Sequence, residues 1–86
     1  MITLELYSKE DCSLCDKAKD VIHRVRQRIP FEYHEVSLVR GTPLEAEMRN
    51  DIPVLRINGV FFAHHVVSEE DLINHLVALG ASRGDQ

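Results

Sequence analysis

The stretch that decides the fold reads Met1-Ile2-Thr3-Leu4-Glu5-Leu6-Tyr7-Ser8-Lys9-Glu10-Asp11-Cys12-Ser13-Leu14-Cys15. Residues 2–7 alternate apolar and polar side chains, which predicts a half-buried strand. Cys12 and Cys15 are the only cysteines of the chain, and a helical pattern follows them. Both thiols are therefore expected at a helix N-terminus, where unpaired N–H groups and the helix dipole favour a thiolate. Thiol–disulfide chemistry requires such a placement.

An amphipathic helix is expected to begin at Ser13 and to end before Pro30. Its apolar residues recur at steps of three and four and form one stripe: Leu14, Ala18, Val21, Ile22, Val25 and Ile29. Residues 31–36 have the pattern of a second strand. Thr42-Pro43-Leu44-Glu45 is a capping box with proline at the first helical position, which predicts a short helix to about Arg49.

Two short strands are expected at 54–57 and 60–63, joined by Asn58-Gly59. That dipeptide suits a two-residue type I′ turn, because both central residues of the turn need positive φ. Ser68 then caps a last helix, which Gly80 ends. The order β-α-β-α-β-β-α predicts an α/β fold in which helices flank a central four-stranded mixed sheet.

Size and composition indicate one small domain, which we place at residues 1–80, followed by a flexible C-terminal tail at 81–86. With 44% hydrophobic and 28% charged residues, the chain has the composition of a globular protein. Its net charge of −4 argues against a nucleic-acid partner, and we interpret Arg24, Arg26 and Arg28 as a solvated helix face. We expect a monomer.

Hydropathy gives no sign of a membrane segment, because no apolar stretch approaches the length of a membrane span. A strand pattern begins at once and leaves no room for a signal peptide, so a cytoplasmic location is expected. In that reducing compartment a C-x-x-C pair is more often catalytic or metal-binding than a structural crosslink.

Three features together make the chain resemble the glutaredoxin-like branch of the thioredoxin-fold family. The segment from Tyr7 to Cys15 looks like the strand, lysine-containing loop and C-x-x-C of glutaredoxins. Ile52-Pro53-Val54 is similar to the hydrophobic-Pro dipeptide that opens the third strand of these proteins and carries their cis-proline. The order of elements extends the resemblance over nearly the whole chain. It implies a thioredoxin-like fold and a dithiol–disulfide oxidoreductase.

The chain also departs from the glutaredoxin pattern. Ser13-Leu14 stands where Pro-Tyr is common, and Asp51 stands where threonine is common. The Gly-Gly pair that lets glutathione approach the backbone has no counterpart, since His64-His65-Val66-Val67 occupies that stretch. The C-x-L-C sequence followed by Asp16 looks more like a small glutaredoxin-like family than like a glutathione-using member. The resemblance therefore implies redox chemistry but does not identify glutathione as the reductant.

The expected roles follow from this resemblance and from the spacing of the cysteines. Cys12 is the attacking thiol and Cys15 the resolving thiol, because positions i and i+3 share one helix face and can close a disulfide. The resemblance implies a cis peptide at Pro53, although only ~5–6% of X-Pro bonds are cis in folded proteins. The Ile52 N–H and C=O would then pair with an extended substrate.

The candidate substrate-binding residues are Tyr7, Lys9, Ile52 and Pro53. Two of them have alternatives that the sequence leaves open. Tyr7 is either a border of the active-site loop or a half-buried strand aromatic. Lys9 either steers an anionic partner or is a solvated loop lysine.

Two other kinds of function remain open at this point. Cys12, Cys15 and a distant histidine could coordinate zinc, although His64-His65 lacks the usual spacing. We interpret that pair as a strand end with one imidazole on each face and assign no metal ligand. The chain could also be a redox-inactive binding module. For the oxidoreductase, we expect protein or low-molecular-weight disulfides as substrates, a reductase or glutathione as the reductant, and no bound cofactor.

Overall fold

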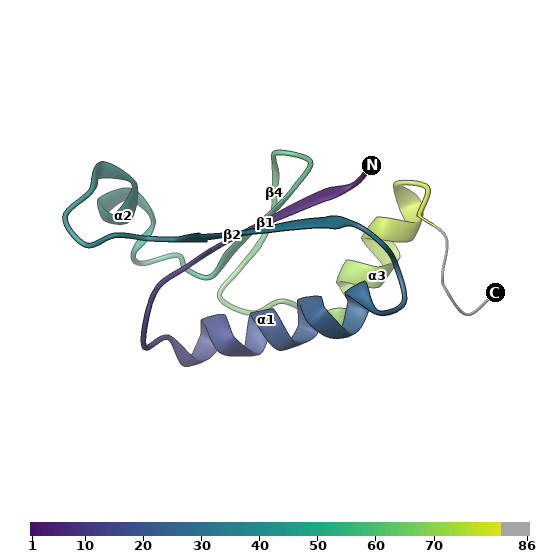
Figure 1. Cartoon of the computed structure of the whole chain (residues 1–86), viewed down its shortest axis with the longest axis horizontal. Helices are drawn as coiled ribbons and strands as arrows, with labels where there is room; N and C mark the ends of the chain where they lie inside the picture. Colours follow the sequence, from purple (N-terminus) through teal and green to yellow (C-terminus); the bar gives the residue numbers. More distant parts are fainter. Residues whose placement is uncertain (82–86) are drawn as a thin grey trace.

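The helices and strands follow one another in the predicted order in the computed structural model, which describes residues 1–81 (Figure 1). They are β1 (Thr3–Ser8), α1 (Ser13–Arg26), β2 (Glu32–Ser37), α2 (Pro43–Met48), β3 (Val54–Ile57), β4 (Val60–His64) and α3 (Glu69–Ala78). Except for Ala81, the tail predicted at 81–86 lies outside the described residues. No helix among residues 1–81 is long and apolar enough to cross a membrane.

The four strands form one sheet in the order β2-β1-β3-β4, which confirms the predicted mixed α/β architecture. β1 pairs with β2 in parallel and with β3 antiparallel, so the strand that leads into the cysteines lies at the centre of the sheet. β3 and β4 form the predicted hairpin. At its turn, Asn58 and Gly59 have φ of 52° and 80°, the positive values that a type I′ turn needs.

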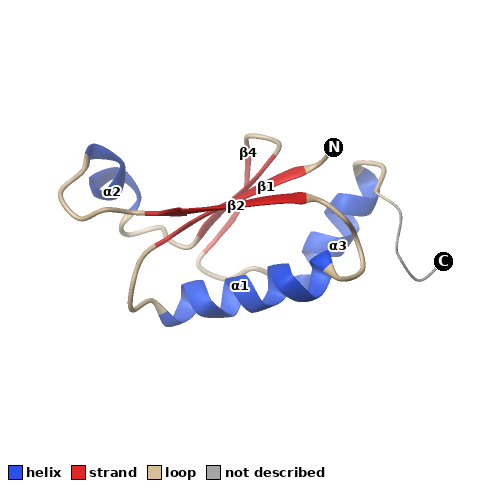
Figure 2. Ribbon diagram, viewed as in Figure 1, coloured by secondary structure: helices blue, strands red, loops and turns tan. Residues whose placement is uncertain are grey.

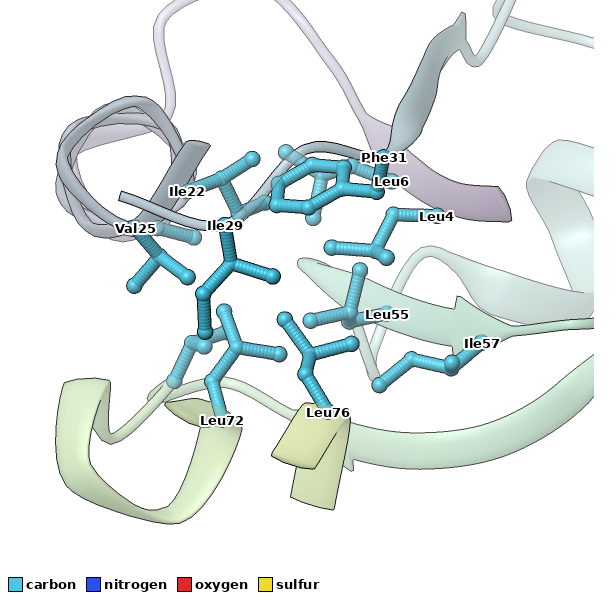
Figure 3. Packing of buried hydrophobic residues seen from close by; sticks show 12 residues of the cluster. Leu4, Leu6, Ile22, Val25, Ile29, Phe31, Leu55, Ile57, Leu72 and Leu76 are labelled. Carbon is cyan, nitrogen blue, oxygen red and sulfur yellow. The ribbon is translucent and has the colours of Figure 1, made fainter. Parts of the chain in front are cut away.

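Helices α1 and α3 cover one face of the sheet, whereas α2 lies apart from them at one end (Figure 2). Between these two helices and the sheet lies the main core, in which leucine, isoleucine, valine and phenylalanine side chains interdigitate (Figure 3). Its fully buried members include Leu4, Leu6, Ile22, Val25, Leu55, Leu72 and Leu76. The alternation of β1 and the helical stripe of α1 therefore bury most of the residues that their periodicities predict. Leu14, which the predicted stripe included, is an exception, because it is 39% exposed.

A second, smaller cluster contains one of the cysteines. It comprises Tyr7, Cys15, Leu38, Met48, Ile52 and Val54. Tyr7 and Val54 are register partners on adjacent strands, so their side chains leave the sheet on the same face. The smaller cluster thus joins the first turn of α1 to α2 and to the segment that opens β3.

Capping residues predicted the starts of α2 and α3 correctly, whereas the apolar pattern of α1 did not predict where that helix ends. Thr42 and Ser68 cap α2 and α3 as predicted, each accepting a hydrogen bond from the N–H three residues later. Helix α1 ends at Arg26, earlier than its apolar stripe suggested. Ile29 remains buried in a tighter turn in which Arg28 donates to the Val25 carbonyl, because the following proline disfavours helical φ and ψ at residue 29.

Strand β4 carries an extra residue relative to β3. The register shifts between Leu55 and Arg56, so Arg56 faces Phe61 while Leu55 faces Ala63 and Val54 faces His64. This bulge places His64 on the face of the sheet that carries Val54, away from the main core.

Candidate active site

Cys12 is the N-cap residue of α1, as the sequence predicted. Its backbone is extended (φ −119°, ψ 103°), and its carbonyl accepts the first helical hydrogen bond from the Asp16 N–H at 3.1 Å. The Cys15 N–H donates to the Cys12 Sγ at 3.2 Å. The sulfur of Cys12 therefore occupies the place of a capping oxygen, where the free N–H groups of the first turn stabilise negative charge.

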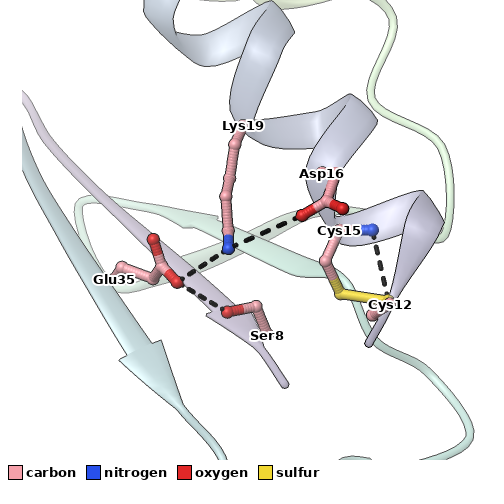
Figure 4. A network of polar contacts seen from close by, with 6 residues as sticks. All are labelled: Ser8, Cys12, Cys15, Asp16, Lys19 and Glu35. Atoms are coloured by element: carbon pink, nitrogen blue, oxygen red, sulfur yellow. Dashed lines mark hydrogen bonds and ion pairs between the residues drawn. A yellow bond between two sulfur atoms is a disulfide. The ribbon is translucent and has the colours of Figure 1, made fainter. Parts of the chain in front are cut away.

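The two cysteines form a disulfide, with their Cα atoms 5.2 Å apart (Figure 4). Cys15 is completely buried, whereas Cys12 is partly exposed. A substrate can therefore reach only the Cys12 sulfur from solvent. This asymmetry matches the roles of attacking and resolving thiol that the spacing suggested.

The segment that opens β3 forms the hydrophobic support of the pair. The Ile52-Pro53 peptide is cis, which confirms the prediction, and Pro53 is fully buried. Ile52 packs in the smaller cluster beside Cys15, with Cys12 at the edge of that cluster. The Ile52 N–H, however, donates to the Met48 carbonyl at 3.1 Å. The expectation that both backbone groups of Ile52 face a substrate is therefore wrong, and only the carbonyl remains for that role.

The other two predicted substrate-binding residues lie in different surroundings. Tyr7 is only 8% exposed and packs in the cluster with Cys15, while the Arg56 guanidinium lies 5.1 Å from its ring centroid. This placement is that of the strand aromatic rather than of a loop border. Lys9 is exposed and lines an open groove of about 610 Å³. Asp11, Arg40 and Glu45 also line the groove, which gives it charges of both signs beside the cysteine loop.

A polar network that the sequence analysis did not identify lies behind the cysteine turn (Figure 4). The Lys19 ammonium of α1 lies 3.0 Å from the Glu35 carboxylate of β2, which also accepts a hydrogen bond from the Ser8 hydroxyl at 3.0 Å. Asp16 lies 4.0 Å from the same ammonium. The network ties α1, β1 and β2 together. Strand alternation is the sequence signal that could have identified Glu35 as part of this network. Glu35 pairs with Leu6 and so points to the face that α1 covers.

The charges of this network shift two ionisation equilibria. Burial opposes ionisation of Glu35, but hydrogen bonds from Lys19 and Ser8 outweigh it and hold the pKa of that carboxyl below its usual range. Burial raises the pKa of Tyr33 to about 12, and the nearby Glu35 charge adds to this effect. Glu35 is therefore ionised and Tyr33 neutral at physiological pH.

Glu35→Gln should make the protein less sensitive to acid. Because the Glu35 pKa is lowered in the folded state, its stabilisation is present above the ordinary value of 4.5 and is lost as the pH falls through the folded-state value. Since the carboxylate is 37% exposed, we expect the effect to stay below ~1 kcal/mol. Urea unfolding across a pH series measures it. The matched control is Glu47→Gln, an exposed glutamate on α2 outside this network; equal acid sensitivity of both variants would contradict the prediction.

The histidines at the end of β4 do not take the predicted positions. The expectation of one imidazole on each face is wrong, because the ring centroids of His64 and His65 are only 4.3 Å apart. His65 has φ of 63°, and this left-handed conformation breaks the alternation of the strand. Within residues 1–81, neither cysteine joins a histidine in a group of three side chains able to hold a metal ion. The zinc site of Cys12, Cys15 and a histidine therefore gains no support.

Three features define a thioredoxin-fold protein: a mixed sheet in the order β2-β1-β3-β4, a C-x-x-C pair whose first cysteine caps α1, and a cis peptide before Pro53 whose Ile52 side chain packs in the cluster of Cys15. The family model described as "Glutaredoxin-like domain (DUF836)" matches residues 3–77, and the chain belongs to this glutaredoxin-like family.

Two solved structures are similar to this chain. One is the X-ray structure of a structural genomics target protein from X. campestris, which is 27% identical and has a TM-score of 0.72. That match covers 87% of this chain and 96% of the other. The second is the structure of a malarial protein, 15% identical with a TM-score of 0.60 over 91% of this chain and 96% of the other. The second likeness concerns the fold alone.

Proposed function

We propose that this protein is a thiol–disulfide oxidoreductase that reduces disulfides through a Cys12–Cys15 dithiol/disulfide cycle. The observation that carries the proposal is the difference between the two sulfurs. Cys12 is partly exposed and caps a helix, while Cys15 is completely buried one turn further on. Membership of a glutaredoxin-like family supports the same chemistry.

The cycle has two exchange steps. The Cys12 thiolate attacks one sulfur of a substrate disulfide, which forms a mixed disulfide and releases the other substrate sulfur as a thiolate. The Cys15 thiol then loses its proton and attacks the Cys12 sulfur, which forms the Cys12–Cys15 disulfide and releases the second substrate thiolate. The substrate gains two electrons and two protons. An external dithiol, or two molecules of a monothiol, returns the protein to its reduced form.

The surroundings of Cys12 support disulfides carried on proteins or small molecules as substrates. The groove is lined by two cations, Lys9 and Arg40, and by three carboxylates, Glu10, Asp11 and Glu45, and this mixture of charges favours neither a strongly acidic nor a strongly basic substrate. The Ile52 carbonyl can accept one hydrogen bond from an extended substrate. A reductase or glutathione supplies the electrons, no bound cofactor is needed, and the cytoplasm is the compartment whose reducing poise suits the cycle.

A redox titration tests the proposal. Purified protein is equilibrated in glutathione buffers of increasing potential, and thiols are trapped by alkylation and counted by mass spectrometry. We expect a reversible two-electron transition of the Cys12–Cys15 pair between about −280 and −180 mV. A glutathionylated species trapped during the titration would identify glutathione as a reductant for this site.

The titration also contains the result that would overturn the proposal. A pair that stays reduced over the whole range, or that oxidises only irreversibly, excludes a dithiol cycle. The protein would then be better described as a redox-inactive binding module that has kept the fold.

A further inference from the structure

Three metal-binding side chains meet at the segment that opens β3, separate from the cysteine pair. Asp51 directly precedes Ile52, His64 is the last residue of β4, and His65 follows it. One ligand atom from each of the three lies within 4.8 Å of the others, and all three side chains are exposed. Exposed side chains at this separation need only small rotations to share one ion, since ligands bound at ~2.0–2.2 Å stand roughly 3.3 Å apart in a tetrahedron.

An unusual backbone turn brings the two imidazoles together. Consecutive strand residues point to opposite faces, so His64 and His65 would normally be separated by the sheet. Instead, His65 has φ of 63°, and the Val66 N–H donates to the His64 carbonyl at 2.7 Å, which closes a three-residue turn. The His65 N–H donates to the Pro53 carbonyl at 2.8 Å. For a residue other than glycine this conformation is uncommon, and it holds both rings beside Asp51.

A hydrogen bond fixes the tautomer of one imidazole. The His65 Nε2 lies 2.9 Å from the Asn50 carbonyl, which can only accept, so Nε2 carries the proton. The lone pair of the His65 ring is therefore on Nδ1. Histidines that bind metals almost always donate their other N–H to a carbonyl or carboxylate in this way, because the bond orients the ring.

From these observations we propose that Asp51, His64 and His65 form a binding site for one divalent transition-metal ion, for which Zn²⁺ is the probe. Two imidazole nitrogens and one carboxylate oxygen suit Zn²⁺ and its neighbours rather than Ca²⁺ or Mg²⁺, which prefer sites made only of oxygen. Three protein ligands leave a fourth position open. Asp51 and His64 also line a groove of about 370 Å³, through which an outside ligand can reach that position.

The bound ion would connect the loop before the cis-proline to the end of β4. Asp51 lies on the chain segment that carries Ile52, and His64 pairs with Val54 just beyond Pro53. The ion therefore braces the segment on which the cysteine pair packs, without using either sulfur as a ligand. The site does not depend on the proposed redox function.

Zinc binding by the oxidised, untagged protein tests this site. With the Cys12–Cys15 disulfide intact, no thiolate can bind the ion. We expect titration against a chromogenic chelator to give one Zn²⁺ per chain, unaffected by excess Mg²⁺. Asp51→Asn, His64→Ala and His65→Ala should each weaken binding at least tenfold, and His34→Ala, an exposed histidine on β2, should leave it unchanged.

An NMR titration provides the second measurement. Zn²⁺ should shift the amide resonances of residues 50–52, 54 and 63–66 and leave those of α1 unchanged. The absence of saturable binding would overturn the proposal. Binding that survives all three substitutions at the site, or that His34→Ala removes equally, would also overturn it. Circular dichroism of each variant shows whether a loss of binding reflects the missing ligand or a loss of fold.

Discussion

Disulfide reduction should fall by roughly 10³-fold or more, to the uncatalysed background, when Cys12 is replaced by serine. Of the two cysteine sulfurs, a substrate can reach only that of Cys12, because Cys15 is completely buried. A hydroxyl at the helix N-cap still accepts the hydrogen bond from the Cys15 N–H, so the fold should be kept while the nucleophile is lost. The assay follows reduction of a small disulfide by protein that has first been reduced and freed of reductant.

Cys15→Ser should stop the same cycle one step later. The Cys12 thiolate still attacks the substrate, but no resolving thiol is present, so a mixed disulfide accumulates in a one-to-one ratio with protein. Mass spectrometry measures it directly as an added substrate mass. The matched control is Ser13→Ala, an exposed residue between the two cysteines, which should react like the natural protein. Full activity of Cys12→Ser would contradict the proposed function, and full turnover of Cys15→Ser without added thiol would contradict the role of Cys15.

The largest expected effect on stability comes from the centre of the main core. Leu55→Ala should lower the free energy of unfolding by ~3 kcal/mol, within the range of about 2–5 kcal/mol measured for buried leucines. Leu55 is completely buried on β3, where the side chains of α1 and α3 meet the sheet (Figure 3). The substitution leaves a cavity that the sheet cannot close. A small domain has a total stability near the lower end of about 5–15 kcal/mol, so this loss is a large fraction of it.

Urea unfolding at constant pH measures the change, and Val60→Ala is the control. Val60 lies on the neighbouring strand but is 68% exposed, so its truncation should change the stability by less than about 0.5 kcal/mol. A loss of less than about 1 kcal/mol for Leu55→Ala would show that the core repacks around the missing atoms.

Local chemistry explains why much of the fold could be predicted from the sequence. Asn58-Gly59 predicted the hairpin because few other residues adopt positive φ in succession, and the structure has this turn. Thr42 and Ser68 predicted the starts of two helices because each side chain caps an N–H of its own helix. The position of Cys12 followed from the same local reasoning. The family resemblance predicted the cis peptide before Pro53, which spacing alone would have made trans.

The features that were missed depend on contacts between distant segments. The pairing of Lys19 with Glu35 depends on the register of β1 and β2 and on the rotation of α1 about its axis above them. Neither can be inferred from a short segment of the sequence. The hydrogen bond from the Ile52 N–H to Met48 depends on the path between α2 and β3. The position of His65 was predicted wrongly because positive φ is uncommon for residues other than glycine, and here a hydrogen bond from the His65 N–H to the Pro53 carbonyl accompanies it.

The position of α3 has a consequence for synthesis on the ribosome. Strand β1, helix α1 and strand β2 emerge first and can pair locally, but Leu72 and Leu76, which complete the main core, emerge only after the remaining strands. At translation rates of ~5–20 residues per second, Leu4, Leu6 and Ile22 remain uncovered for a few seconds before helix α3 is synthesised. The nascent chain therefore exposes an apolar surface during that interval, which is the kind of surface that chaperones bind.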